Sequence, residues 1–220
     1  MPHHHPPDCP ETASHVKILR FIRGSYSGHP VDRLNEMKNV LPLRSQRLTF
    51  RRLTEADIEP MHSYQSREDY AVHAWRGPRD MDDVIGMVKD HLGERPWAED
   101  GDQFRFAVSP HDTDELAGEI VLTLADAESA QVEIGWALHP DHTGKGYAAE
   151  AAYAAVDAAF QKLGAHRVFA RLDSLNVASA KVCERIGMRH EATLRESHFQ
   201  LGEWRDELIY GVLVSEREFD

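Results

Sequence analysis

The amino-acid sequence predicts an α+β fold in which a mostly antiparallel sheet contains one strand–helix–strand crossover. Three observations predict it. Alternating strand patterns follow one another across short turns in the middle of the chain, a long helical pattern comes next, and two long strand patterns close the chain. Strands joined by short turns pair antiparallel, whereas a helical connection crosses over to a further strand of the sheet.

Composition narrows the class of protein. The chain has 220 residues, with 25 Lys and Arg against 37 Asp and Glu, which gives a formal charge of −12. This charge argues against nucleic acid as a partner, because phosphate backbones need a basic surface, and it favours cationic amines. No apolar run approaches the roughly 20 residues that span a bilayer, so no membrane is expected. Only Cys9 and Cys183 are present, which is too few for a disulfide framework. A reducing compartment, the cytoplasm, is therefore the expected location.

Residues 1–36 differ from the rest of the chain. They open with three His and several Pro, a composition that favours a largely disordered N-terminal extension. His3, His4, His5 and Cys9 are metal-ligand types, but a disordered polar tail is the expected state and no metal site is predicted. Residues 37–220 are expected to form a single domain.

The first half of that domain contains one strand and two helices before the central strands. Residues 48–53 alternate in polarity and predict a strand. Thr54 is a typical N-cap for a helix that continues to about Tyr64. Asp80 is a typical N-cap for a second helix, whose apolar residues recur on one face as far as Leu92.

The second half contains the crossover. Strands are predicted at residues 104–109, 116–124 and 130–138, and a long helix begins near Gly146 and ends at Gly164. A strand at 166–172, a helix at 176–186 and two strands at 189–200 and 205–214 complete the chain.

The segment from Val132 to Ala148 is the most informative part of the sequence. A strand enters a tight loop with Gly144 and Gly146, and a helix begins directly after it. Glycines let the backbone approach a ligand closely, and the free N–H groups at a helix start favour an anion. This predicts a phosphate or pyrophosphate site.

Three interpretations of the loop compete. A Walker A motif fails, because Gly146 follows Lys145 where Ser or Thr is needed and His139 occupies the place of the first glycine. A dinucleotide fingerprint matches at Gly144, Gly146 and Ala149, but the preceding strand alternates and the loop is long. The third interpretation is a coenzyme A pyrophosphate site.

The chain from about Gln46 to Val214 resembles the GNAT superfamily of acyl-CoA-dependent N-acyltransferases, and within it the ribosomal-protein N-terminal acetyltransferase (RimJ/RimL-like) branch. The resemblance is carried by several motifs in the right order. These are Glu133-Ile134-Gly135-Trp136, His139-Pro140, Gly144-Lys145-Gly146-Tyr147-Ala148, Glu150-Ala151, the stretch from Asn176 through Ser179 to Gly187-Met188, and Arg195-Glu196 with Gly202, Trp204 and Asp206. The family's Gln or Arg three residues before the first glycine is Asp141 here.

The resemblance implies the GNAT fold, with about six to seven strands splayed at the cofactor site and about four helices. It implies transfer of an acyl group, most simply acetyl, from acyl-CoA to a primary amine of a small molecule or protein N-terminus. Glu133 would be the general base. The implied cofactor-binding residues are Trp136, Ala137, Leu138, Thr143, Gly144, Lys145, Gly146, Tyr147, Ala148, Asn176 and Ser179.

Other expectations from the resemblance concern the proton donor and the acceptor. The family's tyrosine donor is replaced by Cys183, which reads as an apolar helix position, so Asn176 and Ser179 are the remaining polar candidates near the leaving thiolate. Substrate contacts are expected from Tyr70, His73, Trp75, His198 and Trp204. A homodimer is a family-level expectation. Succinyl-CoA as donor and a non-catalytic acyl-CoA-binding module stay open as alternatives.

Overall fold

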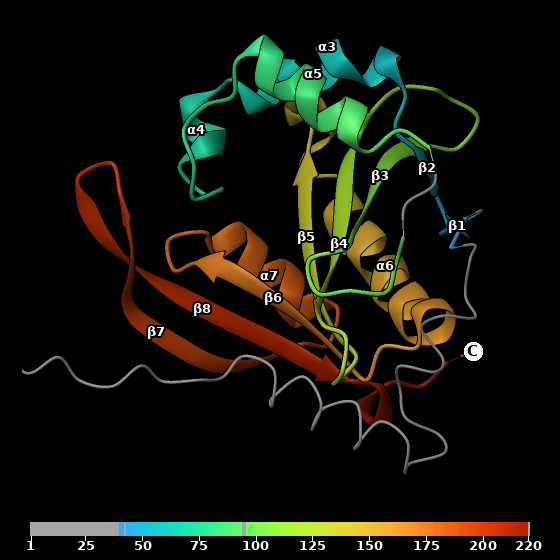
Figure 1. Cartoon of the computed structure of the whole chain (residues 1–220), viewed down its shortest axis with the longest axis vertical. Helices are drawn as coiled ribbons and strands as arrows, with labels where there is room; N and C mark the ends of the chain where they lie inside the picture. Colours follow the sequence, from blue (N-terminus) through green and yellow to red (C-terminus); the bar gives the residue numbers. More distant parts are fainter. Residues whose placement is uncertain (1–39, 42, 94–95, 220) are drawn as a thin grey trace, which may run out of the picture.

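The computed structural model describes residues 40–41, 43–93 and 96–219, and it arranges eight strands in one sheet in the order β1-β2-β3-β4-β5-β6-β8-β7 (Figure 1). The strands are β1 Leu43–Arg44, β2 Leu48–Arg52, β3 Gln103–Pro110, β4 Gly118–Asp126, β5 Gln131–Leu138, β6 Arg167–Asp173, β7 Arg189–Gln200 and β8 Glu203–Leu213. Neighbours pair antiparallel except β5 and β6, which pair parallel across the α6 crossover. The predicted α+β fold is confirmed. The predicted N-terminal extension, residues 1–36, lies outside the described residues.

The predicted strands are all present, and the two-residue β1 adds one to the expected six to seven. The helices are α3 Ile58–Gln65, α4 Glu68–Ala71, α5 Met81–Asp90, α6 Tyr147–Leu163 and α7 Val177–Arg185. Asp80 caps α5 as predicted, because its carboxylate accepts the backbone N–H of Asp83 at 2.8 Å. Helix α4 was not predicted, since four residues are too few to show a helical period.

Two apolar clusters pack on opposite faces of the sheet. On one face, Val132 and Ile134 of β5 join the large core that α6 covers with Val156 and Leu163. On the other face, Ala137 contacts the smaller cluster formed with α3 and α5. Figure 1 shows α3, α4 and α5 grouped together, apart from α6 and α7. The alternation of β5 therefore directs successive side chains to two different layers.

Strands β5 and β6 separate soon after they begin to pair. Their parallel register covers only Gln131–Glu133 against Arg167–Phe169, although β5 continues to Leu138 and β6 to Asp173. Beyond Glu133, one edge of β5 is therefore not paired with a strand in the described part of the chain. This separation confirms the expected splay of the sheet, and it positions the site described next.

Candidate functional site

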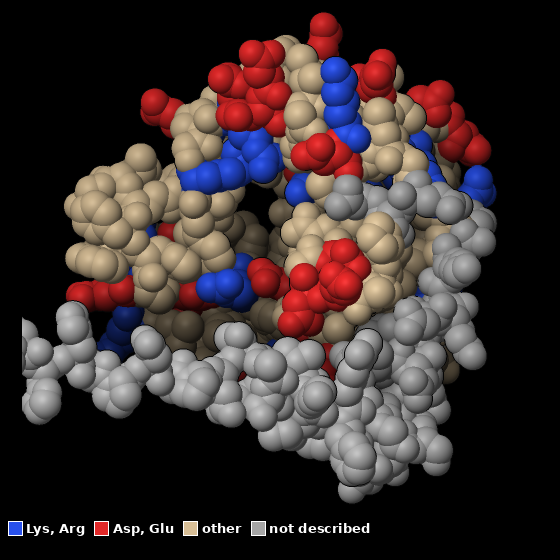
Figure 2. Space-filling model, viewed as in Figure 1, with Lys and Arg blue, Asp and Glu red and all other residues tan. Residues whose placement is uncertain are grey.

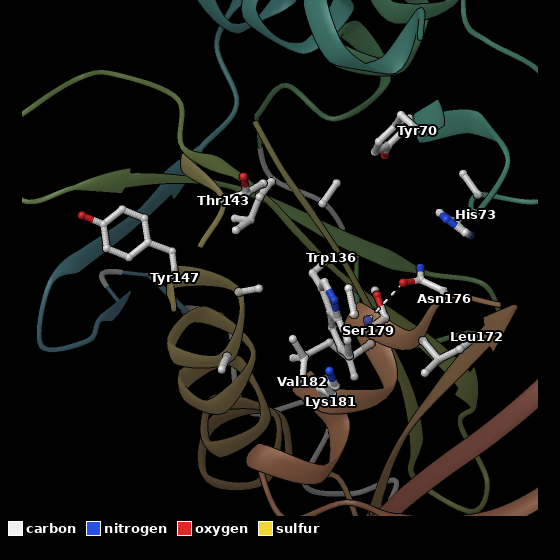
Figure 3. A pocket seen from close by; sticks show the side chains of 18 of the residues that line it. Tyr70, His73, Trp136, Thr143, Tyr147, Leu172, Asn176, Ser179, Lys181 and Val182 are labelled. Carbon is white, nitrogen blue, oxygen red and sulfur yellow. Dashed lines mark hydrogen bonds between the residues drawn. The ribbon is translucent and has the colours of Figure 1, made fainter. Parts of the chain in front are cut away.

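A cavity of about 1130 Å³ lies where β5 and β6 part. Figure 2 shows the hollow on the surface, and Figure 3 shows side chains around it from several elements. Strand β5 contributes its second half, β6 its end, α6 its first turn, α7 one side along its length, and the α4 region the opposite wall. Of the residues predicted to bind the cofactor, those that line the cavity are Trp136, Ala137, Leu138, Thr143, Gly144, Gly146, Tyr147, Ala148, Asn176 and Ser179.

The glycine loop has the backbone conformation that its sequence predicts. Gly144 and Gly146 have φ of 74° and 80°, in the left-handed region that favours glycine. Gly146 is the N-cap of α6 and has no side chain to accept the first N–H groups of the helix. A Cβ there would lie 3.6 Å from Nη2 of Arg47. The loop therefore leaves helix-start donors facing the cavity, as an anion site requires.

Two arginines lie close to this loop, because a Cβ at Gly146 would be 3.6 Å from Nη2 of Arg47 and 4.0 Å from Nη1 of Arg185. Lys181 and Arg185 of α7 line the cavity. Arg47 contributes from the start of β2, and its Nη1 donates to the carbonyl of Lys145 at 3.1 Å. The predicted Lys145 is not part of the lining; its Nζ lies 6.0 Å from the centre of the Tyr147 ring. The loop thus combines backbone donors with positive charge, which suits a diphosphate.

Helix α7 presents two polar side chains to the cavity. Oδ1 of Asn176 accepts the backbone N–H of Ser179 at 3.0 Å, drawn as a dashed line in Figure 3. Asn176 is therefore an N-cap whose amide nitrogen stays available as a donor. Cys183, one turn further on, is fully buried in the core, and burial raises the pKa of its thiol to about 12. This burial agrees with the expectation that Cys183 occupies an apolar position of the helix.

Glu133 lies on β5 at the last residue that pairs with β6, beside Phe169. It does not line the cavity, whereas its neighbours Ile134 and Gly135 do. Burial raises the pKa of the Glu133 carboxyl, and nearby Glu207 also raises it, while Arg171 opposes both. A carboxylate with a raised pKa at this position is a better proton acceptor than an ordinary exposed glutamate.

Arg171 and Glu207 form an ion pair next to Glu133. Arg171 of β6 lines the cavity, and its Nε donates to Oε1 of the buried Glu207. Oε2 of Glu207 accepts from Ser197 at 3.1 Å and lies 3.0 Å from Nε2 of His198. Burial raises the pKa of Glu207, but Arg171, Ser197 and His198 together outweigh burial, so the net pKa is lowered. Sequence reasoning missed Arg171, because an arginine within a strand carries no motif.

The wall opposite α7 contains three of the residues predicted to contact substrate. Tyr70 and His73, labelled in Figure 3, line the cavity, as does Trp75. His198 does not line it but packs against Trp75 in a tilted ring contact, with ring centres 4.3 Å apart. Trp204 is 59% exposed and packs against Phe199 near the tip of the β7–β8 hairpin. The structure brings together four of the five, through direct lining or the Trp75 contact.

The arrangement can hold an extended nucleotide thioester. An open strand edge offers backbone groups for an amide-bearing arm, the glycine cradle offers donors for a diphosphate, and Glu133 lies where the strands part. These are the features that coenzyme A needs, so the residues present fit that group.

Comparisons with known proteins agree. A family model described as "Acetyltransferase (GNAT) domain" matches residues 47–189. This chain belongs to the GNAT acetyltransferase family. The uncharacterized N-acetyltransferase YnaD of Bacillus subtilis (strain 168) is 30% identical over 174 residues, which cover 79% of this chain and 98% of the relative. The chain is an acyl-CoA-dependent N-acetyltransferase of this family.

Solved structures show the same fold. A GNAT-family acetyltransferase from Bacillus anthracis has a TM-score of 0.70 and 30% identity, covering 78% of this chain and 97% of the other. Spermidine N-acetyltransferase from Vibrio cholerae, in complex with CoA and spermine, has a TM-score of 0.67 and 22% identity, covering 77% and 96%. Mycobacterium smegmatis RimJ, in complex with CoA-disulfide, has a TM-score of 0.65 and 17% identity, covering 80% and 90%. The similarity to the last two structures shows only that the fold is shared.

Two further findings concern the described residues. None of their helices is both long and apolar enough to cross a membrane. They also contain no group of three or more His, Cys, Asp or Glu side chains arranged to hold a metal ion.

Proposed function

We propose that this GNAT acetyltransferase moves an acetyl group from acetyl-CoA to a primary amine, with Glu133 as the general base. The observation that carries the proposal is the position of Glu133, a half-buried carboxyl with a raised pKa at the residue where β5 and β6 separate. A neutral amine must form from an ammonium before attack, and a base with a pKa raised towards neutrality accepts that proton more readily.

The chain's own groups would position the reactants. Bound acetyl-CoA supplies an activated thioester. Successive N–H groups of a strand point to opposite edges, so Gly135 and Trp136 direct one N–H towards the open edge of β5. That donor would stabilise negative charge on the thioester oxygen. The Gly144–Gly146 loop would hold the diphosphate, and the backbone of Trp136–Leu138 would pair with the pantetheine arm.

The leaving thiolate needs a proton or a donor. Cys183 is buried away from the cavity, whereas Ser179 and Asn176 line it. We assign the amide nitrogen of Asn176 to the pantetheine arm and the hydroxyl of Ser179, or a water beside it, to the thiolate. Asn and Ser in these places also support the RimJ/RimL-like branch, and with it a protein N-terminus as one candidate acceptor.

Glu133→Gln tests the proposal. The expected result is a fall in kcat of about 10²- to 10⁴-fold with the affinity for CoA unchanged, because the amide cannot accept the proton. Calorimetry measures CoA binding and a thiol-release assay measures kcat. Glu128→Gln, in an exposed turn, is the matched control. An unchanged kcat in Glu133→Gln would exclude Glu133 as the base, and CoA binding with no transfer to any amine would favour a non-catalytic module.

The donor is tested in the same assay. Arg171 places a cation in the lining, which is the feature that a succinyl carboxylate would need, but Glu207 already pairs with it. Acetyl-CoA is therefore the proposed donor. A higher kcat/KM with succinyl-CoA than with acetyl-CoA would reverse this assignment.

A further inference from the structure

Two arginines without a carboxylate partner, Arg76 and Arg79, lie next to the cavity wall formed by the α4 region, although neither is among the residues that line the cavity. Nη1 of Arg79 donates to Oε1 of Gln65 at 2.8 Å, and Nη2 of Arg76 donates to the same oxygen at 3.4 Å. Gln65 is fully buried, and its amide nitrogen donates to Glu119 at 2.7 Å. The orientation of Gln65 is thereby fixed, with its only acceptor shared between two guanidinium groups.

Arg76 contacts Tyr70, which lines the cavity, and Arg79 is connected to Arg76 through the Gln65 oxygen that both arginines bind. The guanidinium carbon of Arg76 is 5.4 Å from the centre of the Tyr70 ring. Burial and the charge of Glu119 raise the pKa of Tyr70 to about 12, and Arg76, Arg105 and Arg79 oppose that shift. The tyrosine hydroxyl is therefore within electrostatic reach of three arginines and one glutamate.

The cluster formed by Arg76, Arg79, Arg105 and Glu119 contains three positive charges and one negative charge. Glu119 already pairs with Arg105. Within the described part of the chain, neither Arg76 nor Arg79 has a carboxylate at ion-pair distance. Burial lowers the pKa of Arg79, and the charges of Arg76 and Arg105 lower it further. Two positive charges thus remain uncompensated in a protein whose formal charge is −12.

Other arginines near the cavity and α3 form ion pairs with carboxylates. Arg51 is paired with Asp57, and Arg171 with Glu207. A partly buried guanidinium that lacks such a partner is costly, and an anionic ligand removes that cost. Figure 2 shows Lys and Arg side chains along the upper rim of the hollow, with acidic side chains further out on that side, and acidic side chains next to a basic one at the lower rim.

Trp75 is a second, independent sign of a ligand at this wall. It lines the cavity, and its backbone has φ of 51°, in a region that a tryptophan rarely adopts. Its indole Nε1 is buried and has no hydrogen-bond partner among the described residues. Strained residues with unused donors cluster at ligand sites.

We propose that the acceptor amine carries an anionic group, a carboxylate or a phosphate, which Arg76 and Arg79 bind at the wall formed by Tyr70 and Trp75. This inference rests on the proposed acetyl transfer and names the substrate class of the same site. It reverses the expectation from net charge that a polycation is favoured, because the local charge around the acceptor differs in sign from the charge of the whole chain.

The test compares amines that differ in the anionic group. Full-length protein with saturating acetyl-CoA is assayed with glycylglycine against glycylglycinamide, with O-phosphoethanolamine against ethanolamine, and with spermidine. The first pair reports on a carboxylate and the second on a phosphate. The variants are Arg76→Gln, Arg79→Gln and the charge-retaining Arg76→Lys, and Arg44→Gln on β1 is the control.

The wild type is expected to favour at least one anionic acceptor over its neutral partner by about tenfold or more in kcat/KM, the usual effect of hydrogen bonds to a charged group. The ratio should fall towards one in Arg76→Gln and Arg79→Gln, survive in part in Arg76→Lys and stay unchanged in Arg44→Gln. The inference is overturned if spermidine or the neutral partners are used as well as the anionic amines, or if the ratio is the same in the Gln variants.

A binding measurement separates this inference from the proposed function. Calorimetry compares N-acetylglycylglycine and its carboxamide, titrated into the protein–CoA complex. If CoA binds and no amine is acetylated, the proposed function fails, and this titration then decides whether the anion site exists. Tighter binding of the carboxylate that is lost in Arg76→Gln supports the site; equal binding of the two probes rejects it.

Discussion

Arg47 and Glu150 are 103 residues apart in the sequence and are joined by a hydrogen bond of 2.6 Å from Nε of Arg47 to Oε2 of Glu150. The same carboxylate accepts the hydroxyl of Ser45 at 2.7 Å. Because Arg47 also donates to the carbonyl of Lys145, it connects the start of β2 to the glycine loop and to the first turn of α6. The pair therefore holds the glycine loop and the first turn of α6 against the start of β2.

Glu150→Gln is expected to weaken CoA binding by about three- to tenfold, since Arg47 is partly exposed and the pair is screened by solvent. Thermal unfolding should change little. Calorimetry with CoA measures the effect, and Glu203→Gln, which removes the exposed carboxylate of an ion pair with Arg205, is the control. Unchanged affinity in Glu150→Gln would show that the loop keeps its conformation without the pair.

Arg171→Gln is expected to move the acid limb of the kcat/KM profile to higher pH. Burial already raises the pKa of Glu133, and Arg171 is the charge that opposes this rise. Without Arg171 the pKa of Glu133 rises further, so a larger share of Glu133 is protonated, and inactive as a base, at a given pH. Arg171→Lys keeps the charge and should leave the limb close to its wild-type position. A limb that does not move in Arg171→Gln would mean that another group sets it.

The order of elements could be predicted because their signals are local. Asp80 caps α5, Gly164 ends α6 with φ of 68°, and β5 alternates between two layers. Each of these features depends on neighbours within a few residues. Strand β1 and helix α4 were missed because they are held in place by tertiary contacts and are too short to carry a pattern.

The candidate site could be predicted only where a motif marks it. Gly144, Gly146, Asn176 and Ser179 stand in recognisable spacings, and the structure brings them to one cavity. The charges that surround them do not stand in such spacings. Arg47 reaches the loop from another strand, and the imbalance at Arg76 and Arg79 depends on where Glu119 and Gln65 fold. The sequence does not show which of these distant side chains come into contact.

Cys183→Ala is expected to change kcat less than about twofold if Cys183 has no part in protonating the thiolate. The thiol is fully buried, and burial raises its pKa to about 12. In a Cys9→Ser background, a thiol reagent should therefore modify Cys183 only as fast as the protein unfolds. Fast modification of the folded protein, or a large fall in kcat that is not accompanied by a loss of stability, would place Cys183 in the chemistry after all.

Asp57→Asn is expected to lower the free energy of unfolding by about 2 kcal/mol at pH 7, or the melting temperature by roughly 4–8 °C. Asp57 is 2% exposed, and its two oxygens each accept from Arg51 at 2.7 Å. Burial raises the pKa of this carboxyl, but Arg51 and the backbone of Thr54 hold the net pKa below its ordinary value of 3.8. The stabilisation is therefore complete above that ordinary value and is lost as the pH falls through the lowered pKa of the folded state.

Thermal melts should show a difference in melting temperature between wild type and Asp57→Asn at pH 7 that becomes smaller below about pH 4. Asp80→Asn keeps an N-cap that asparagine also forms, so its melting temperature should stay near wild type. A difference in melting temperature that is the same at low pH would mean that packing around Asp57, and not its charge, provides the stability.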